Sequence, residues 1–133
     1  SVPIEYLTKP TKLSPLEKSI IKEHVERGYE ILKDIPFPLP LAQIIRQHHE
    51  RMDGSGYPQG LVGEQILLES RILAVADVVE SMATNRPYRF AVGIDKAISE
   101  IASNAGILYD SDVAGAVQNL YKKGELQKLL PLV

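Results

Sequence analysis

The 133 residues predict an all-α protein with about five main helices. Along most of the chain, apolar residues recur at the 3.6-residue spacing that is typical of an amphipathic helix. The stretches with this spacing are separated by prolines, glycines and capping residues, which end or begin helices. Because no internal repeat or low-complexity segment is present, we expect one domain over residues 1–133, large enough to bury a core.

The first helix is expected to begin after Ser14, because Ser14-Pro15-Leu16-Glu17 is a capping box with proline at the first helical position. The apolar residues at helical spacing that follow are Leu16, Ile20, Ile21, Val25, Tyr29 and Leu32. Three prolines between residues 36 and 40 end this helix. A second helix then runs from Leu41 to two adjacent histidines.

Four glycines and a proline mark residues 53–63 as a loop. The third helix is expected from about Leu68 to about Ala83. Its apolar residues cover nearly the whole circumference, which is typical of a buried central helix.

The fourth helix is expected at about Gly93 to Asn104. Asp110 or Ser111 caps the fifth, which reaches about Lys123. The tail over residues 126–133 is apolar, so it either docks on the bundle or frays.

Composition excludes several function classes. With 44% hydrophobic and 24% charged residues, the chain is an ordinary globular one. Its net charge of -2 argues against a broad polyanion-binding surface, so we expect no DNA binding and only a local site for phosphate or a nucleotide. Without cysteine, neither disulfides nor thiolate metal sites can form, and a cytoplasmic location is expected. The chain contains no run of 18 apolar residues, so we expect no membrane span within it.

The run from His48 to Pro58 is the most informative segment, since it combines paired histidines with a glycine-rich turn. Imidazole nitrogens suit divalent iron, manganese or zinc, and glycines let the backbone approach a ligand closely. Neighbouring residues on a helix point about 100° apart, so His48 and His49 do not easily bind one ion from the same side. A cluster of two or more metals, or a helix end that splays the pair, would accommodate both.

Asp77 is a second candidate ligand, because a carboxylate in an otherwise apolar helix is costly unless a cation or hydrogen-bond donors satisfy it. A buried salt bridge, or a hydrogen bond to serine or arginine, explains Asp77 about as well. His24 lies on the first helix, where a single histidine is more often no ligand. Taken together, the three histidines and Asp77 form a candidate metal site rich in nitrogen and oxygen.

Two further pairs of residues could support such a site. Glu50 and Asp53 could orient the histidines as hydrogen-bond acceptors, although both could instead belong to the helix C-terminus and the turn after it. For Asp53, which precedes Gly54, the turn role is at least as good an explanation. Arg86 and Arg89 could bind the phosphates of an anionic ligand, although two surface arginines are usually only solvated.

In this order, these residues resemble the HD-GYP family, a branch of the HD-domain metal-dependent phosphohydrolases that degrade cyclic di-GMP. The likeness covers nearly the whole chain and includes the naming tripeptide Gly56-Tyr57-Pro58. The other matching segments are His48-His49-Glu50, residues 53–61, residues 71–77 and Arg86-Pro87-Tyr88-Arg89.

The resemblance implies an HD-domain-like helical bundle that hydrolyses cyclic di-GMP to linear pGpG or GMP with two or three divalent metals, iron or manganese. It implies these metal ligands: His24, His48, His49 and Asp77. It implies that Arg86 and Arg89 hold the phosphates. It also implies a signature loop near the site, which contacts GGDEF-type proteins and includes Asp53, Gly54, Gly56, Tyr57 and Pro58.

The chain departs from the family at its start. The His-Asp dyad and the lysine of the family precede a segment that resembles Val2-Pro3-Ile4, so their positions lie upstream of Ser1. For this reason no catalytic residue is assigned within the chain. We therefore expect a domain that is truncated on its N-terminal side and impaired when isolated. Its uncovered apolar surface is expected to favour a homodimer or to make the domain unstable.

Two other functions stay open at this point. One is a non-catalytic signalling module that binds GGDEF-type proteins through the Gly-Tyr-Pro loop. The other is hydrolysis of a different nucleotide, such as a mixed purine cyclic dinucleotide, because no residue here separates guanine from adenine.

Overall fold

The computed structural model describes residues 14–84 and 93–130, and these residues are helical, joined by loops and turns. The helices are α2 (Pro15–Leu32), α3 (Leu41–Gln47), the 3₁₀ helix η1 (Gly63–Gln65), α4 (Leu68–Ala83), α5 (Ile94–Ser103), α6 (Ser111–Lys122) and α7 (Glu125–Leu129). The predicted all-α fold class is confirmed, and the five expected helices correspond to α2 to α6. The described part of the tail forms the short helix α7, which begins after Gly124 in the left-handed conformation (φ +73°).

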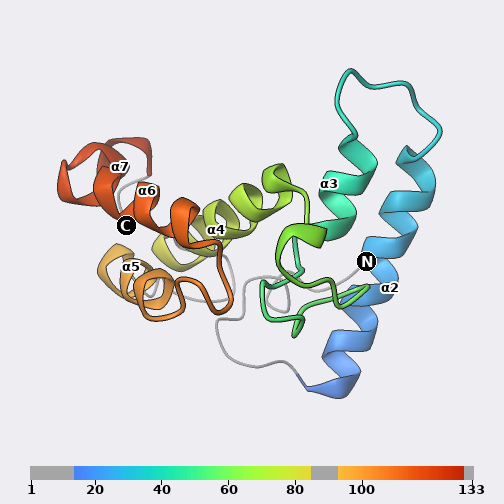
Figure 1. Cartoon of the computed structure of the whole chain (residues 1–133), viewed down its shortest axis with the longest axis horizontal. Helices are drawn as coiled ribbons and strands as arrows, with labels where there is room; N and C mark the ends of the chain where they lie inside the picture. The colour runs from blue at the N-terminus through green and yellow to red at the C-terminus, as the bar shows by residue number, and fades with distance from the viewer. Residues whose placement is uncertain (1–13, 85–92, 131–133) are drawn as a thin grey trace.

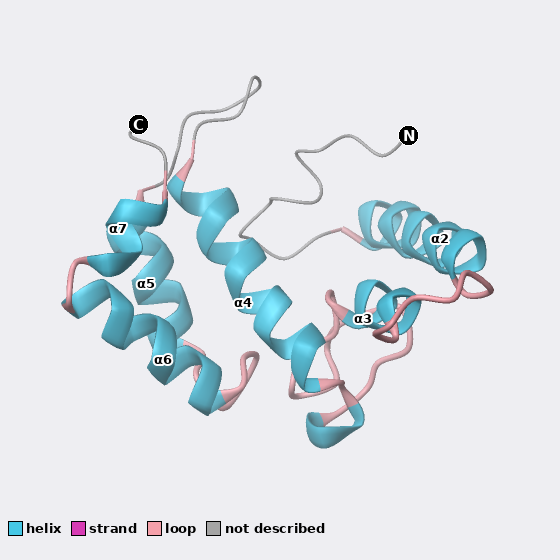
Figure 2. Cartoon of the chain, turned by 90° about the horizontal axis from the view of Figure 1, so that it is seen from above, coloured by secondary structure: helices cyan, strands magenta, loops and turns pink. Residues whose placement is uncertain are grey.

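The helices lie in two groups joined by α4. The helices α2 and α3 form an antiparallel pair at one end of the molecule, α5 to α7 lie at the other, and α4 runs between them (Figures 1 and 2). Within the described ranges, no helix combines the length and the apolar composition needed to cross a bilayer.

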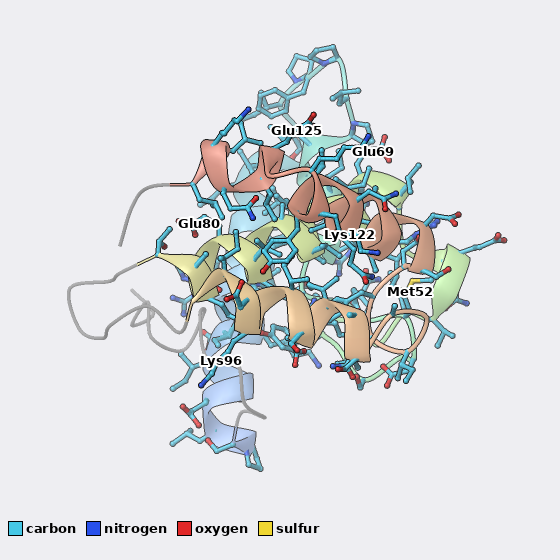
Figure 3. The ribbon with its side chains drawn as sticks, turned by 90° about the vertical axis from the view of Figure 1, so that its left-hand side faces the viewer. Met52, Glu69, Glu80, Lys96, Lys122 and Glu125 are labelled. Atoms are coloured by element: carbon cyan, nitrogen blue, oxygen red, sulfur yellow. The ribbon has the colours of Figure 1, made fainter. Side chains whose placement is uncertain are left out.

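The main core lies between α4 and the three helices that follow it. Its buried residues are Val75, Val79, Met82, Ala97, Ile98, Ile101, Tyr109, Val113, Ala114 and Leu126. Figure 3 shows the outer side of this group, where the charged side chains of Lys96, Lys122 and Glu125 are exposed. The amphipathic pattern of α5 and α6 therefore separates core from solvent as the sequence predicts.

The predicted central position of α4 is confirmed, but the predicted burial is wrong for part of its surface within the described residues. One face is buried through Ser70, Ala74 and Val75, whereas Ile72 on another face is 48% exposed and Leu68 is 50% exposed. A helix is buried all round only where neighbours cover every side. Here the described neighbours of α4 leave these two side chains uncovered.

A partly buried ion pair joins α4 to α6. The Arg71 guanidinium donates to Asp110 Oδ2 at 2.9 Å and to the Ile66 carbonyl at 2.9 Å. The other oxygen of Asp110 accepts from the backbone amides of Asp112 (2.8 Å) and Val113 (3.1 Å), so Asp110, rather than Ser111, caps α6. One carboxylate thus fixes the start of a helix and its position against α4.

The α2–α3 pair is held by a two-bond ion pair. Arg46 donates from Nε and from a terminal nitrogen to the two oxygens of Glu26, at 2.8 and 2.9 Å. The same guanidinium lies 4.3 Å from the centre of the Tyr29 ring. These contacts position α3, which leads directly to the histidine pair.

The expected capping box begins α2 as predicted. The Glu17 amide donates to Ser14 Oγ at 3.1 Å, and the Ser14 amide donates to the Glu17 carboxylate at 3.0 Å.

Replacing Ser14 by alanine should destabilise the first turn by about 1 kcal/mol, because one helix N–H loses its acceptor. Hydrogen exchange of the first turn of α2 should then become faster. Ser19→Ala, on an exposed position inside the same helix, is the matched control and should not accelerate exchange; equal exchange in the two variants would contradict the capping role.

Candidate metal centre

The two histidines lie where α3 ends. The helix stops at Gln47, and His48 is its C-cap residue (φ -72°, ψ -10°). The two imidazole rings lie 4.0 Å apart between centroids and are tilted by 40°. The pair therefore lies at a helix end with its two rings close together, which is compatible with one metal ion or with a cluster. His48 Nδ1 lies 2.6 Å from the Ile45 carbonyl oxygen. A proton on Nδ1 leaves the lone pair of Nε2 for a metal.

Side-chain hydrogen bonds hold this end of α3 against α4. The Leu67 amide donates to Gln47 Oε1 at 2.8 Å, and Ser70 Oγ donates to the Ile44 carbonyl at 2.9 Å. Asp77 lies seven residues after Ser70, two turns along the same face of α4. The contacts that join α3 to α4 therefore bring Asp77 to the histidine pair.

Three of the four predicted metal ligands meet in one group. His48, His49 and Asp77 each offer a ligand atom, and these atoms all lie within 4.8 Å of one another. Two imidazoles and a carboxylate are a donor set suited to iron, manganese or zinc. The pocket at the α2–α3 turn, about 240 Å³ and lined partly by Phe37, shares no residue with this group.

The protonation state of His49 fits a metal ligand. His49 is buried, and this burial lowers its pKa well below the usual value, with smaller electrostatic contributions from His48 and Arg51. The ring is therefore neutral at physiological pH, as metal binding requires. The residues present fit a divalent metal by donor chemistry and by charge state.

The Gly-Tyr-Pro loop lies directly against this group. The Tyr57 ring stacks on the His49 ring, with centroids 5.1 Å apart and planes inclined by 20°. Burial raises the pKa of Tyr57 to about 12, opposed by Arg51 and reinforced by the negative charge of Asp77. The Tyr57 hydroxyl is therefore protonated at neutral pH, and the negative charge of Asp77 contributes to its raised pKa.

Glu50 takes part in the loop after the histidines, which is the turn role that the sequence also allowed. It is only 2% exposed, and its carboxylate oxygens accept from the backbone amides of Gln59 (2.7 Å) and Leu61 (2.9 Å). The carboxylate thus binds the loop directly, and its role in orienting a histidine ring stays a prediction. A glycine-rich loop leaves amides without helix or sheet partners, and a nearby carboxylate is the signal that could have indicated this role.

Comparison with known proteins shows the family. The HD domain family model matches residues 1–113 of this chain. The chain belongs to the HD domain family. Its similarity to cyclic dinucleotide phosphodiesterases confirms the HD-GYP assignment that the sequence motif predicted.

Three relatives illustrate that similarity. The cyclic di-GMP phosphodiesterase response regulator RpfG of Xanthomonas campestris pv. campestris is 45% identical over 112 residues, which cover 83% of this chain and 30% of that protein. A cyclic di-GMP phosphodiesterase of Thermotoga maritima is 40% identical over 124 residues, 92% of this chain and 34% of that protein. The 3'3'-cGAMP-specific phosphodiesterase 3 of Vibrio cholerae is 35% identical over 112 residues, 84% of this chain and 24% of that protein. This HD-GYP chain thus covers between 24% and 34% of the length of these curated relatives.

Two predicted site residues of this HD-GYP chain are described but lie outside the group. Asp53 is exposed and accepts from the Ser55 amide (3.0 Å) and hydroxyl (2.6 Å), which is the turn role that the sequence also allowed. His24 is exposed on α2 and does not belong to the group of three. Its role as a ligand stays a prediction.

Other predicted features fall outside the described residues. Arg86 and Arg89, expected to hold phosphates, lie in the stretch 85–92. Ser1, upstream of which the His-Asp dyad and the lysine of the family are expected, lies in the stretch 1–13. The phosphate-binding role of the two arginines and the placement of the dyad before Ser1 therefore both stay predictions.

Sequence reasoning overlooked Arg51. Its guanidinium donates to the backbone carbonyls of His48 (3.3 Å) and Glu50 (3.0 Å) and lies 5.6 Å from the centre of the Tyr109 ring. The Met52 amide donates to the Leu108 carbonyl at 2.9 Å. These contacts tie the segment after the histidines to the α5–α6 connection.

Proposed function

We propose that the protein carrying this chain is a metal-dependent phosphodiesterase that hydrolyses cyclic di-GMP to linear pGpG or GMP. The proposed centre holds two or three divalent metals, iron or manganese. The observation that supports it most is the group of His48, His49 and Asp77, which offers three ligand atoms within 4.8 Å of one another. Relatives named as cyclic di-GMP phosphodiesterases in two organisms support the substrate.

In this proposal the chain supplies ligands and a shaped surface. His48, His49 and Asp77 hold metal, and His24 is a further ligand. Arg86 and Arg89 bind the substrate phosphates, since guanidinium groups match phosphate oxygens bidentately. Divalent metal ions, when bound, supply a nucleophile at neutral pH and offset the charge that develops on the phosphate. The stacked Tyr57 ring covers one face of the buried, neutral His49 imidazole, so this face is shielded from water.

The position of Tyr57 favours an enzyme over a purely docking module. Its ring stacks on a proposed metal ligand, whereas a residue dedicated to a partner protein would present the ring to solvent. Contact with GGDEF-type proteins therefore fits the exposed side of the loop, at Ser55 and Gln59, as an added role. A homodimer and a cytoplasmic location also belong to the proposal, and the exposed Leu68 and Ile72 of α4 support the homodimer.

Hydrolysis by the full-length protein tests this function. With manganese or ferrous iron added, it should convert cyclic di-GMP to pGpG or GMP, measured by liquid chromatography, and a chelator should stop the reaction. In parallel, 3'3'-cGAMP should be tested, because a Vibrio cholerae relative is named as specific for it. If only 3'3'-cGAMP is hydrolysed, it replaces cyclic di-GMP as the proposed substrate. If the metal-loaded protein hydrolyses neither compound, the proposed phosphodiesterase activity is contradicted.

A further inference from the structure

The loop over residues 53–63, called the signature loop here, is anchored to the segment that carries the histidines. At its base, Asp53 and Val62 form an isolated antiparallel bridge, and the Gly63 amide donates to the Met52 carbonyl at 3.0 Å. Above the base, the buried Glu50 carboxylate accepts from the amides of Gln59 and Leu61. A single side chain adjacent to His49 therefore holds the far half of the loop.

The near half of the loop packs on the backbone of the same segment. A Cβ atom at Gly56 would lie 2.4 Å from the His49 carbonyl oxygen and 2.5 Å from the Arg51 nitrogen. Only glycine allows this approach, because no real Cβ comes so close to backbone atoms. The Tyr57 amide donates to the same His49 carbonyl at 3.3 Å.

These two anchors together fix the Tyr57 ring. The anchored positions lie on both sides of Tyr57 in sequence, with Gly56 before it and Gln59 and Leu61 after it. The Tyr57 ring between them stacks on the imidazole of His49. The imidazole thus has one neighbour in the His48 ring and another in the Tyr57 ring. A ligand ring held this way is preorganised, since little freedom is left to lose on metal binding.

We propose that Glu50 is a positioning residue of the metal centre, which holds the signature loop so that Tyr57 keeps the His49 ring in its metal-binding orientation. This inference rests on the proposed function, because it assumes that His49 binds metal. It assigns the signature loop a role inside the site in addition to any contact with a partner.

Glu50→Gln in the full-length protein tests the anchor. The carboxamide turns one acceptor into an NH₂ donor, which then faces a loop amide that is also a donor. We expect faster hydrogen exchange over residues 56–62 and a manganese affinity, by titration calorimetry, that falls at least about tenfold. The matched control is Glu64→Gln, an exposed carboxylate just after the loop, which should change neither quantity.

Two variants at Tyr57 test the same chain of contacts without touching the anchor. Tyr57→Phe keeps an aromatic ring on His49 and should retain manganese affinity within about threefold, whereas Tyr57→Leu should lose about tenfold. A purely structural role would lower thermal stability in Tyr57→Leu without separating the two variants in metal affinity. These variants decide the proposal if Glu50→Gln does not fold.

The outcomes separate this inference from the proposed function. Wild-type protein that binds no manganese would overturn the metal centre itself and this inference with it. Wild-type protein that binds manganese, with Glu50→Gln or Tyr57→Leu binding it equally well, would overturn only the positioning role.

Discussion

Replacing His49 by alanine in the full-length protein is expected to lower both manganese affinity and cyclic di-GMP hydrolysis by at least about a hundredfold. His49 is buried and neutral, and it lies within one group with His48 and Asp77. Alanine removes one of the three ligand atoms that this group offers. Titration calorimetry and product chromatography measure the two quantities separately.

A second ligand variant tests the same assignment if His49→Ala does not fold. Asp77→Asn keeps the shape of the side chain but weakens it as a ligand, so it should follow His49→Ala in both measurements. The matched control is Asp34→Asn, which changes an exposed carboxylate in the turn after α2 and should leave both unchanged. Full activity in His49→Ala at unchanged metal content would show that the ligand assignment is wrong.

Replacing Asp110 by alanine is expected to destabilise the fold by about 3 kcal/mol. The change leaves the partly buried Arg71 guanidinium without its carboxylate and removes the acceptor for two amides at the start of α6. Asp112→Ala is the matched control, since Asp112 is exposed in the same first turn and should cost well under 1 kcal/mol. Urea unfolding and hydrogen exchange in the first turn of α6 measure the effect, and equal losses in both variants would contradict the assigned ion pair.

The same carboxylate predicts a pH dependence. Burial alone would raise the pKa of Asp110, but the hydrogen bonds from Arg71 and from the amides of Val113 and Asp112 outweigh it and lower this pKa. A carboxyl group with a depressed folded-state pKa stabilises the fold above its unfolded pKa of about 4, and this contribution is lost as pH falls through the folded value. The stability difference between wild type and Asp110→Asn should therefore be full at about pH 6 and shrink towards about pH 3. A difference that is constant over this range would exclude the ionised carboxylate as its source.

Local sequence signals predicted most of the helices. The capping box at Ser14 and Glu17 acts over three residues, and so does the cap of α6 at Asp110. Such contacts are encoded by neighbours along the chain, so a sequence pattern shows them directly. The position of the histidine pair at a helix end could also be predicted, because the glycines that follow the pair end the helix.

Contacts between distant segments were not predictable in this way. The Arg71–Asp110 pair joins residues 39 positions apart, and the stacking of Tyr57 on His49 depends on a loop that folds back on its own start. Glu50 was recognised as a candidate, but its partners are backbone amides, which a sequence pattern does not distinguish. The burial of α4 was overestimated, because an apolar side chain is buried only where another segment packs against it, and the sequence pattern does not show which segment does so.

The central claim is that His48, His49 and Asp77 hold metal. The most direct measurement is anomalous diffraction from crystals of the full-length protein loaded with manganese. We predict anomalous peaks within bonding distance of an imidazole nitrogen of each histidine and of an Asp77 carboxylate oxygen. Manganese bound elsewhere in active protein, with the two imidazoles and the Asp77 carboxylate bonded only to other protein groups, would contradict the claim.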